Sequence, residues 1–278
     1  MKLSEYQELY RKLSTPGDID FLAENFGYDK EFLLVIYNQR VTRDTMKSFY
    51  RVKAQAGRLA YEWNRGEPFL SIANRYRFPP VLLAQMILEY QGMNRKQFWK
   101  HLGDLATAPD ARLRKELKDV MDNDLIYSPA GTEIQYARGR WGEARLKTWL
   151  EERGVQYRTE SQIRGEFEKT PDALLKTPLK WEGSTYYWIE SKAIVGDPYE
   201  VKRHIKKQLV PYTQLFGDGV VVYWFGYVED GDIGLPDGIT MMDSEAFERF
   251  RPTVSAPLPE DFHRPDRAKA LRAKASPM

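Results

Sequence analysis

The spacing of apolar residues changes once along this 278-residue chain, near Gly131, and the change separates two kinds of structure. From Met1 to about Gly103 apolar residues recur three and four positions apart, which predicts helices and no strands. Beyond Gly131 helical stretches alternate with strand-like runs, and the most apolar run, 219–227 (GVVVYWFGY), predicts a buried strand. We therefore expect an all-α N-terminal region and an α/β C-terminal domain.

An internal repeat organises the helical region. Segment 19–36 places apolar residues, a small residue and a glycine, Gly27, at the spacing of a helix-turn-helix, and segment 72–86 repeats this pattern. In the second copy Arg77 stands where the first has its turn glycine, and Pro80 opens the next helix, where proline is tolerated. These features predict a tandem helix-turn-helix region that spans 1–103.

Cations form a stripe on one predicted helix of this region, from about 42 to 64. At roughly 100° per residue the basic side chains fall on one narrow face, while apolar residues occupy the opposite face. Such a row can follow a phosphate backbone, so we expect it to bind DNA. The alternative is that the stripe is ordinary solvated surface and the repeat is plain helical packing. The stripe consists of Arg40, Arg43, Lys47, Arg51 and Arg58.

Breaker residues set the remaining boundaries. The stretch 104–131 reads as a charged helical linker and ends at a cluster of small residues and proline, 128–131 (SPAG). The domain that carries the chemistry is then expected over 132–250. Prolines punctuate 251–278, which lacks periodicity and predicts a mobile tail.

The amino-acid composition limits which kinds of metal site this chain can form. The chain has no cysteine, which excludes disulfides and thiolate metal sites, and its three histidines show no zinc-ligand spacing. A bound metal would therefore be a hard cation held by carboxylates. The charged N-terminus and the lack of a long apolar run predict a cytoplasmic protein without a membrane partner. The net charge of +2 is weak evidence for any nucleic-acid partner.

Three polar residues stand out in the α/β part. Asp172 follows a proline in the triplet 170–172 (TPD), and Glu190 and Lys192 lie on a strand predicted over 185–193. Because side chains alternate along a strand, Glu190 and Lys192 should share one face with Tyr186 and Trp188. A carboxylate and an amine inside so aromatic a strand are costly to bury unless something satisfies them.

A divalent metal ion would satisfy them. Asp172 and Glu190 can supply oxygen ligands to Mg²⁺ or Mn²⁺, and Glu143, on the helix predicted over 137–153, offers an additional acid. Lys192 could then position the attacking water and stabilise the transition state of phosphodiester hydrolysis. The competing interpretation is a solvated ion pair, since an acid followed by a D/E-x-K pattern arises often by chance.

Three stretches taken together resemble a known family. They are 170–179 (TPDALLKTPL), 186–197 (YYWIESKAIVGD) and 208–228 (QLVPYTQLFGDGVVVYWFGYV), and they resemble the TPD-motif family, which includes codanin-interacting nucleases of animals and archaeal relatives. The resemblance covers about 139–227. It implies a restriction-endonuclease-like fold of the PD-(D/E)xK superfamily, similar to archaeal Holliday-junction resolvases. The catalytic set that it implies is Asp172, Glu190 and Lys192, with Glu143 as the helix acid and Gln208 in an auxiliary role.

Two further polar residues each allow two interpretations. Asp197 follows Gly196, and we favour a turn or capping role for it over a role in the site. His204 lies among four cations in 202–207, a cluster that is either a solvated helix face or a second phosphate contact.

The function we expect is that of a metal-dependent endodeoxyribonuclease; which DNA structure it cuts stays open, with junctions and flaps as candidates. The alternative, from a different class, is a catalytically weak nucleic-acid-binding or scaffold module that keeps the nuclease fold, because animal relatives are known mainly for binding a protein partner. RNA is an open alternative as substrate, and a homodimer is expected by analogy with resolvases only.

Overall fold

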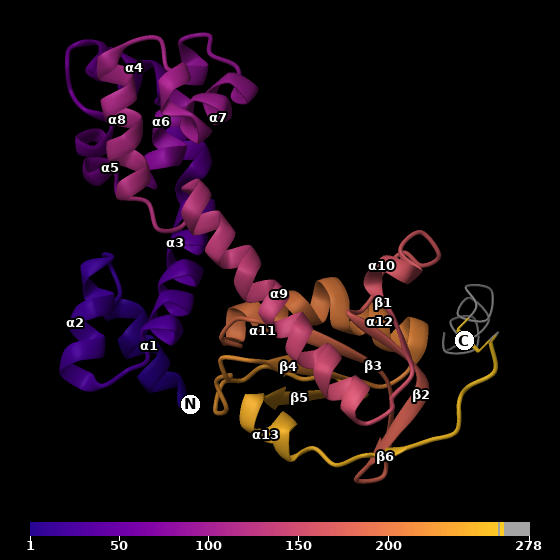
Figure 1. The fold of residues 1–278 in the computed structure, drawn as a ribbon. Coiled ribbons are helices and arrows are strands. Elements are labelled where there is room, and N and C mark those ends of the chain that lie inside the picture. Colours follow the sequence, from indigo (N-terminus) through magenta and orange to yellow (C-terminus); the bar gives the residue numbers. More distant parts are fainter. Residues whose placement is uncertain (261, 264–278) are drawn as a thin grey trace, which may run out of the picture. The chain divides into compact units, whose positions relative to one another are not determined.

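The computed structural model describes residues 1–260, 262 and 263. The chain divides into two compact units, which we call the helical unit, 12–137, and the sheet unit, which joins 1–11 to the chain from 138 onward (Figure 1). Two helices run across the division: α1 (Leu3–Lys12) at its end, and α9 (Pro129–Glu152) in its middle. The division groups residues 1–11 with the sheet unit and includes 104–131, the stretch predicted as a linker, in the helical unit.

The helical unit contains an apolar core that gathers buried residues from Val52 to Val120. Its elements are α2 (Gly17–Phe26), α3 (Lys30–Lys53), α4 (Ala56–Asn64), α5 (Phe69–Tyr76), α6 (Pro80–Tyr90), α7 (Arg95–Gly103), η1 (Leu105–Thr107) and α8 (Ala111–Asp122). Helix α8 lies in the stretch predicted as a linker, yet its Leu113, Leu117 and Val120 are buried in the same core as Phe69 and Phe98. An amphipathic helix buries its apolar face wherever a partner surface exists, so this segment completes the core.

The repeated turn is present in both copies. Gly27 ends α2 and Arg77 ends α5, and each residue has a positive φ, 71° and 47° respectively. This left-handed conformation is easy for glycine and costs energy for arginine, so packing around the second turn must hold it. Helix α6 begins with Pro80, as the pattern predicted.

The single helix predicted from 42 to 64 is not observed. Helix α3 ends at Lys53, and after a short break α4 begins at Ala56. The break lets α4 bury Leu59 and Ala60 in the core that it shares with α6. Consequently Arg58 lies on a different helix from the other four residues of the stripe.

The sheet unit contains a mixed sheet. Its elements after α9 are β1 (Tyr157–Thr159), α10 (Glu160–Ile163), β2 (Ala173–Trp181), β3 (Ser184–Lys192), α11 (Pro198–His204), η2 (Ile205–Leu209), α12 (Val210–Phe216), β4 (Gly219–Tyr223), β5 (Ile239–Asp243), α13 (Ser244–Arg249) and β6 (Thr253–Val254). The strand order is β1-β2-β3-β4-β5. Strands β1, β2 and β3 are antiparallel neighbours, whereas β4 and β5 continue parallel to β3. Strand β6 pairs with β2, beyond the expected domain end at 250.

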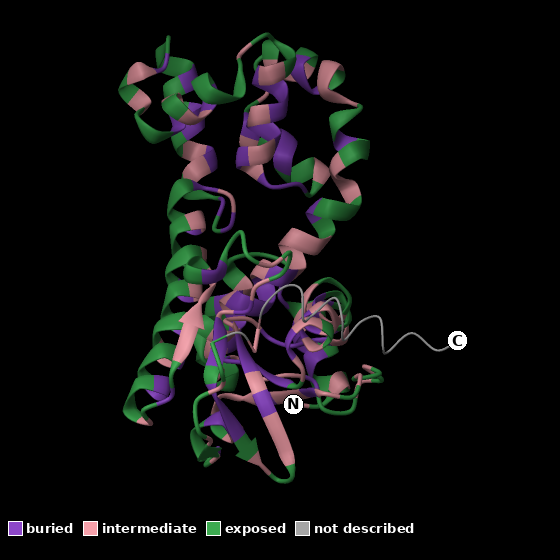
Figure 2. Ribbon diagram, turned by 90° about the vertical axis from the view of Figure 1, so that its right-hand side faces the viewer, coloured by how far each residue is buried: buried purple, intermediate pink, exposed green. Residues whose placement is uncertain are grey.

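Helices cover both faces of this sheet (Figure 1). On one face α9 contributes Trp149 and Leu150, and α13 contributes Phe247, to a core with strand residues such as Val220. On the other face α11 and α12 pack on Trp188 and its neighbours. Figure 2 shows the result: buried residues line the interior, and exposed residues follow the outer sides of the helices. The helical region and the mixed α/β sheet agree with the expected classes.

One predicted face assignment on β3 is wrong. Trp188 lies on the α12 side, as Glu190 and Lys192 should, but Tyr186 packs in the opposite core with Phe250. Strict alternation fails here because the pairing of β2 with β3 shifts register between Leu174 and Leu179.

The expected mobile tail, 251–278, is described only in part. Residues up to 258 lie along β2, where the amides of Ser255 and Leu258 donate hydrogen bonds to the carbonyls of Pro178 and Lys176. Positions 261 and 264–278 of this segment lie outside the described residues. Among the described helices none is both long enough and apolar enough to cross a membrane.

Candidate active site

Two sheet elements bring the candidate residues together. Asp172 directly precedes β2, and Glu190 and Lys192 end β3, the antiparallel neighbour of β2. Within the sheet, Glu190 and Lys192 stand beside Val221 and Tyr223 of the parallel strand β4. Alternation along β3 therefore places both polar side chains on the face that α11 and α12 cover. Glu190 is only 3% exposed.

Hydrogen bonds connect the three residues. The backbone amide of Asp172 donates to Glu190 Oε2 at 3.2 Å, and the amide of Ser191 donates to Asp172 Oδ2 at 2.8 Å. Lys192 Nζ donates to Glu190 Oε1 at 2.5 Å. Asp172, Glu190 and Lys192 thus form one connected group, as the sequence predicted, and Ser191 joins it through its backbone.

The charges in this group do not cancel, because two carboxylates lie beside a single amine. Burial, followed by the negative charge of Glu190, raises the pKa of Asp172, although Lys192 and the Ser191 amide act in the opposite direction. Burial alone would lower the pKa of Lys192, but Glu190 and Asp172 raise it, so this amine keeps its proton. The buried carboxylate of Glu190 and the half-buried carboxylate of Asp172 therefore share one cation. Such a pair of oxygen donors fits a hard divalent cation, which would stabilise both charges.

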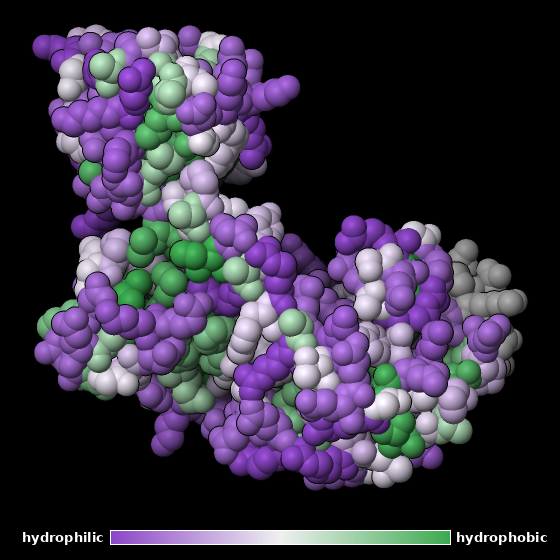
Figure 3. All heavy atoms as spheres, in the orientation of Figure 1, coloured by the Kyte–Doolittle hydropathy of each residue, from purple (hydrophilic) through white to green (hydrophobic). Residues whose placement is uncertain are grey.

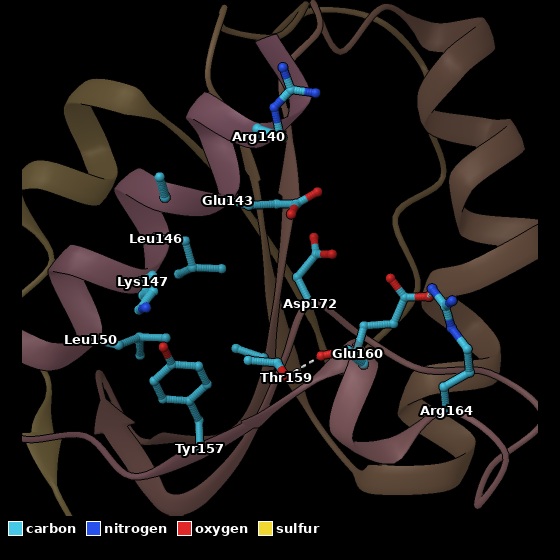
Figure 4. A pocket seen from close by; sticks show the side chains of 13 residues that line it. Arg140, Glu143, Leu146, Lys147, Leu150, Tyr157, Thr159, Glu160, Arg164 and Asp172 are labelled. Carbon is cyan, nitrogen blue, oxygen red and sulfur yellow. Dashed lines mark hydrogen bonds and ion pairs between the residues drawn. The ribbon is translucent and has the colours of Figure 1, made fainter. Parts of the chain in front are cut away.

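Glu143 approaches Asp172, but not Glu190, from the opposite face of the sheet. It projects from α9 and lines a cavity together with Asp172, and Figure 4 shows the two carboxylates pointing into the same space. Its charge also contributes to the raised pKa of Asp172. Asp172 thus stands between Glu190 on one side and Glu143 on the other. Across residues 1–260, 262 and 263 no three His, Cys, Asp or Glu side chains are grouped closely enough to hold a metal ion.

The helix that covers Glu190 is irregular. A π-helical turn, η2, separates α11 from α12, and the amide of Val210 donates to the carbonyl of Ile205. Pro211, which has no N–H to donate, follows directly, and the wider turn accommodates it. Gln208 lies half-buried within this π-helical turn. Its predicted auxiliary role stays a prediction.

Sequence reasoning missed Tyr212, one turn beyond Gln208. Its hydroxyl donates a hydrogen bond to the carbonyl of Thr170 at 2.9 Å, at the start of the TPD triplet. Burial, and then the charges of Glu190 and Asp172, raise its pKa. The phenol therefore lies beside both carboxylates and stays protonated. The only signal in the sequence was its position in an amphipathic helix, which is equally typical of a core residue.

Asp197 and His204, which each allowed two interpretations, both have hydrogen-bond partners in the structure. Asp197 caps α11, because Oδ1 accepts hydrogen bonds from the amides of Tyr199 and Glu200, at 2.8 and 3.2 Å; the favoured capping role is confirmed. Its second oxygen accepts a hydrogen bond from the Tyr6 hydroxyl at 2.7 Å. His204 is buried, unlike the cations around it, and its Nδ1 lies 3.0 Å from the Tyr223 hydroxyl.

The cations proposed to bind DNA lie in the helical unit, and several of them pair with neighbouring acids. Asp44 pairs with Arg40 at 3.7 Å and with Lys47 at 3.9 Å, and Glu62 pairs with Arg58 at 3.1 Å. Arg43 and Arg51 belong to α3 as well. Hydrophilic residues are widespread on the face of both units that Figure 3 shows, so hydrophilicity alone does not mark a binding surface there. DNA binding by the stripe stays a prediction.

Comparison with known proteins gives concordant matches. Residues 109–245 match a family described as "Protein of unknown function TPD sequence-motif". The chain is similar to the CDAN1-interacting nuclease 1 of Danio rerio, with 31% identity over 228 residues that cover 76% of each protein. The Xenopus laevis relative of the same name is 32% identical, over 63% of this chain and 60% of its own length. The Homo sapiens relative is 31% identical, over 62% of this chain and 64% of its own length. The match thus spans less than two thirds of these two relatives. No solved structure matches this chain.

Proposed function

Because the chain belongs to the family defined by the TPD sequence motif, whose curated animal members are named as nucleases, we propose that it is a metal-dependent nuclease. Its substrate is DNA, and its sheet unit is a restriction-endonuclease-like domain of the PD-(D/E)xK type. The observation that carries the proposal is the connected group of Asp172, Glu190 and Lys192. Two neighbouring acids with a single amine are poorly balanced as a structural feature, and the group has the composition that phosphodiester hydrolysis needs.

Each residue has a distinct task. Asp172 and Glu190 would hold a Mg²⁺ or Mn²⁺ ion, which when bound supplies charge neutralisation at the scissile phosphate and activation of water. Lys192 keeps its proton, so its amine can stabilise negative charge that develops on the phosphate oxygens. Glu143, on the open side of Asp172, can accept a hydrogen bond from the attacking water.

A second function follows from the names of the relatives. Those proteins are described as interacting with CDAN1, so we propose binding of a protein partner as the alternative role of this chain. In that case the acid pair would be a remnant without turnover.

Two substitutions test the nuclease proposal. Asp172→Asn removes a proposed metal ligand, and Lys192→Ala removes the cation; each should lower the cleavage rate at least about a hundredfold with Mg²⁺ or Mn²⁺ present. The measurement is the single-turnover rate on a panel of single-stranded, duplex, flap and junction DNA. Lys180→Ala is the matched control, because this lysine is exposed on the neighbouring strand β2. It should cleave at the wild-type rate.

Two other results would contradict the nuclease proposal. Wild-type rates in both site variants, with folding verified by circular dichroism, would mean that the group has no catalytic role. A wild-type protein that cleaves no member of the panel with either ion leaves the partner-binding role as the better description.

A further inference from the structure

A cavity opens on the solvent side of Asp172. It has a volume of about 520 Å³ and lies between α9, β1 and α10, entirely within the sheet unit. Small-molecule sites in proteins fall between about 300 and 1,000 Å³, so one nucleotide fits a space of this size. Figure 4 shows the lining side chains around a common opening, with Asp172 between Glu143 and Glu160.

The two walls of the cavity differ in character. Leu146 and Leu150 of α9, together with the ring of Tyr157 on β1, form an apolar wall (Figure 4). The opposite wall is polar and comes from 159–164, where Thr159 and Ser161 have their hydroxyl oxygens 2.9 Å apart. This division suits a ligand with one flat apolar part and one polar part.

Cations lie along the opening. Arg140 and Lys147 project from α9 on either side of Glu143, and Arg164 follows α10. Arg164 forms an ion pair with Glu160 at 3.0 Å but remains largely exposed, and a guanidinium has five donors to share. These side chains can hold phosphate oxygens next to Asp172, while Glu160 is already neutralised by its partner.

We propose that this cavity binds one unpaired nucleotide of the substrate strand, next to the phosphodiester that is cut. The base lies against the half-buried ring of Tyr157, and Arg140 and Arg164 contact the adjoining phosphate. A base inside a duplex cannot reach such a cavity without leaving its stack, and an already unpaired base saves that cost. The substrate class is therefore DNA with an unpaired nucleotide at the cleavage site. This inference rests on the proposed nuclease function.

The test compares two DNA duplexes of one sequence, of which the second carries a single unpaired 2-aminopurine nucleotide. Stacking on an aromatic side chain is strong enough for the wild-type protein to favour the second duplex by about tenfold in kcat/KM. Tyr157→Leu should reduce this preference to about twofold or less, whereas Tyr157→Phe, which keeps the ring, should retain it. A full preference in Tyr157→Leu, or none in the wild type, overturns the proposal.

A matched arginine pair tests the phosphate contact. Arg164→Gln should raise KM for the duplex with the unpaired nucleotide by about tenfold, the loss typical of one charge-assisted hydrogen bond. Arg249→Gln is its control, because Arg249 is also exposed and paired with the glutamate four residues earlier, at 2.5 Å. Equal KM values for the two variants contradict the phosphate contact. Thermal unfolding of each variant verifies that it is folded.

A binding measurement separates this inference from the nuclease proposal. With Ca²⁺ in place of Mg²⁺, 2-aminopurine fluorescence should be quenched on binding to wild type and Tyr157→Phe, but not on binding to Tyr157→Leu. If no duplex is ever cleaved, the nuclease proposal fails while this quenching still supports the cavity as a nucleotide site. Unquenched fluorescence in the wild type refutes the nucleotide site, whether or not cleavage occurs.

Discussion

Single side chains fix the geometry of the acid pair. Asp172 belongs to a loop that leads into β2, and a loop would normally leave its position variable. Three hydrogen bonds hold it: its own amide binds Glu190, its carboxylate accepts from Ser191, and the Tyr212 hydroxyl binds the Thr170 carbonyl two residues earlier. The last of these links the loop to α12.

Removal of the Tyr212 hydroxyl should therefore impair catalysis more than folding. We expect Tyr212→Phe to lower kcat about tenfold with little change in KM, since a small displacement of Asp172 affects the reaction more than binding. Tyr186→Phe is the control, because that buried hydroxyl, 3.0 Å from Thr240 Oγ1, serves the opposite core. Steady-state kinetics on the best substrate of the panel decide the matter; equal kcat values for both variants would reduce Tyr212 to a core residue.

His204 should make stability depend on pH. Burial, followed by the charges of Lys192 and Arg203, lowers its pKa to about 3, while an unfolded chain binds the proton near pH 6.5. Its neutral form is thus compatible with the fold above pH 6.5, and stability is lost as pH falls towards 3. Between pH 7 and pH 5 this residue should account for a loss of about 2 kcal/mol.

Urea unfolding at the two pH values, without metal, measures that loss. In His204→Gln the decrease in unfolding free energy between pH 7 and pH 5 should be smaller than in the wild type by that amount. An identical pH dependence in the two proteins would show that His204 accepts a proton without cost.

Local sequence patterns were sufficient to predict where some of these residues lie. The alternation of YYWIESKA predicted that Glu190 and Lys192 share a face, because that rule depends only on neighbours in the sequence. Tyr212 and His204 gain their roles from partners far along the chain, Thr170 and Tyr223. No spacing rule connects such positions, so they could not be predicted.

At the scale of helices and strands, α9 packs closely on the sheet. Gly142 faces Trp224 and Ser191, and a Cβ atom at this position would lie 2.8 Å from the indole ring and 2.9 Å from Ser191 Oγ. The indole N–H donates to that same hydroxyl at 2.7 Å. One helical turn earlier Gly139 has open space around it. Glycine is thus required for packing at one position and is only a weak helix former at the other.

Alanine at these two positions should have opposite effects. Gly142→Ala should destabilise the protein by about 1–3 kcal/mol through overpacking, and should slow cleavage because Ser191 also binds Asp172. Gly139→Ala should stabilise it by about 0.5–1 kcal/mol through higher helix propensity. Denaturant unfolding together with cleavage rates checks both. If Gly142→Ala is also stabilising, α9 is not packed as tightly as described.

Secondary structure was predictable where the apolar period was strong. The helices of the repeat and strands β3 and β4 follow their patterns, although β4 ends earlier than expected, at Tyr223. Strand β2 was missed because Pro178 lies inside it and its burial does not alternate. The break between α3 and α4 was missed for another reason: tertiary packing of Leu59, rather than a breaker in the sequence, determines it.

For the chain as a whole, the proposed function assigns DNA affinity to the helical unit and chemistry to the sheet unit. Lys47→Glu combined with Arg51→Glu should weaken DNA binding and flatten its dependence on salt, by roughly one slope unit for each phosphate that the variant no longer neutralises. The cleavage rate at saturating DNA should persist, since both residues lie outside the acid pair. Fluorescence anisotropy at several salt concentrations measures the slope.

The control for this charge reversal is Lys115→Glu with Lys118→Glu. Both lysines are exposed on α8 of the same unit, and Lys118 pairs with Asp122. This control variant changes the net charge by the same amount, so it corrects for long-range repulsion of DNA. An equal decrease of affinity in the two double variants would mean that the stripe on α3 has no special role.

The segment after α13 also covers part of the outer edge of the sheet. Strand β1 covers only the first part of the outer side of β2, and β6 with the following residues occupies the rest through Ser255 and Leu258. A chain shortened before Thr253 would bare unpaired amides and carbonyls on an edge strand, which favours pairing between molecules. Such a shortened protein should aggregate on storage and scatter light at concentrations where the longer chain stays dispersed. Attempts to trim this protein for crystallisation should therefore spare residues 253–258.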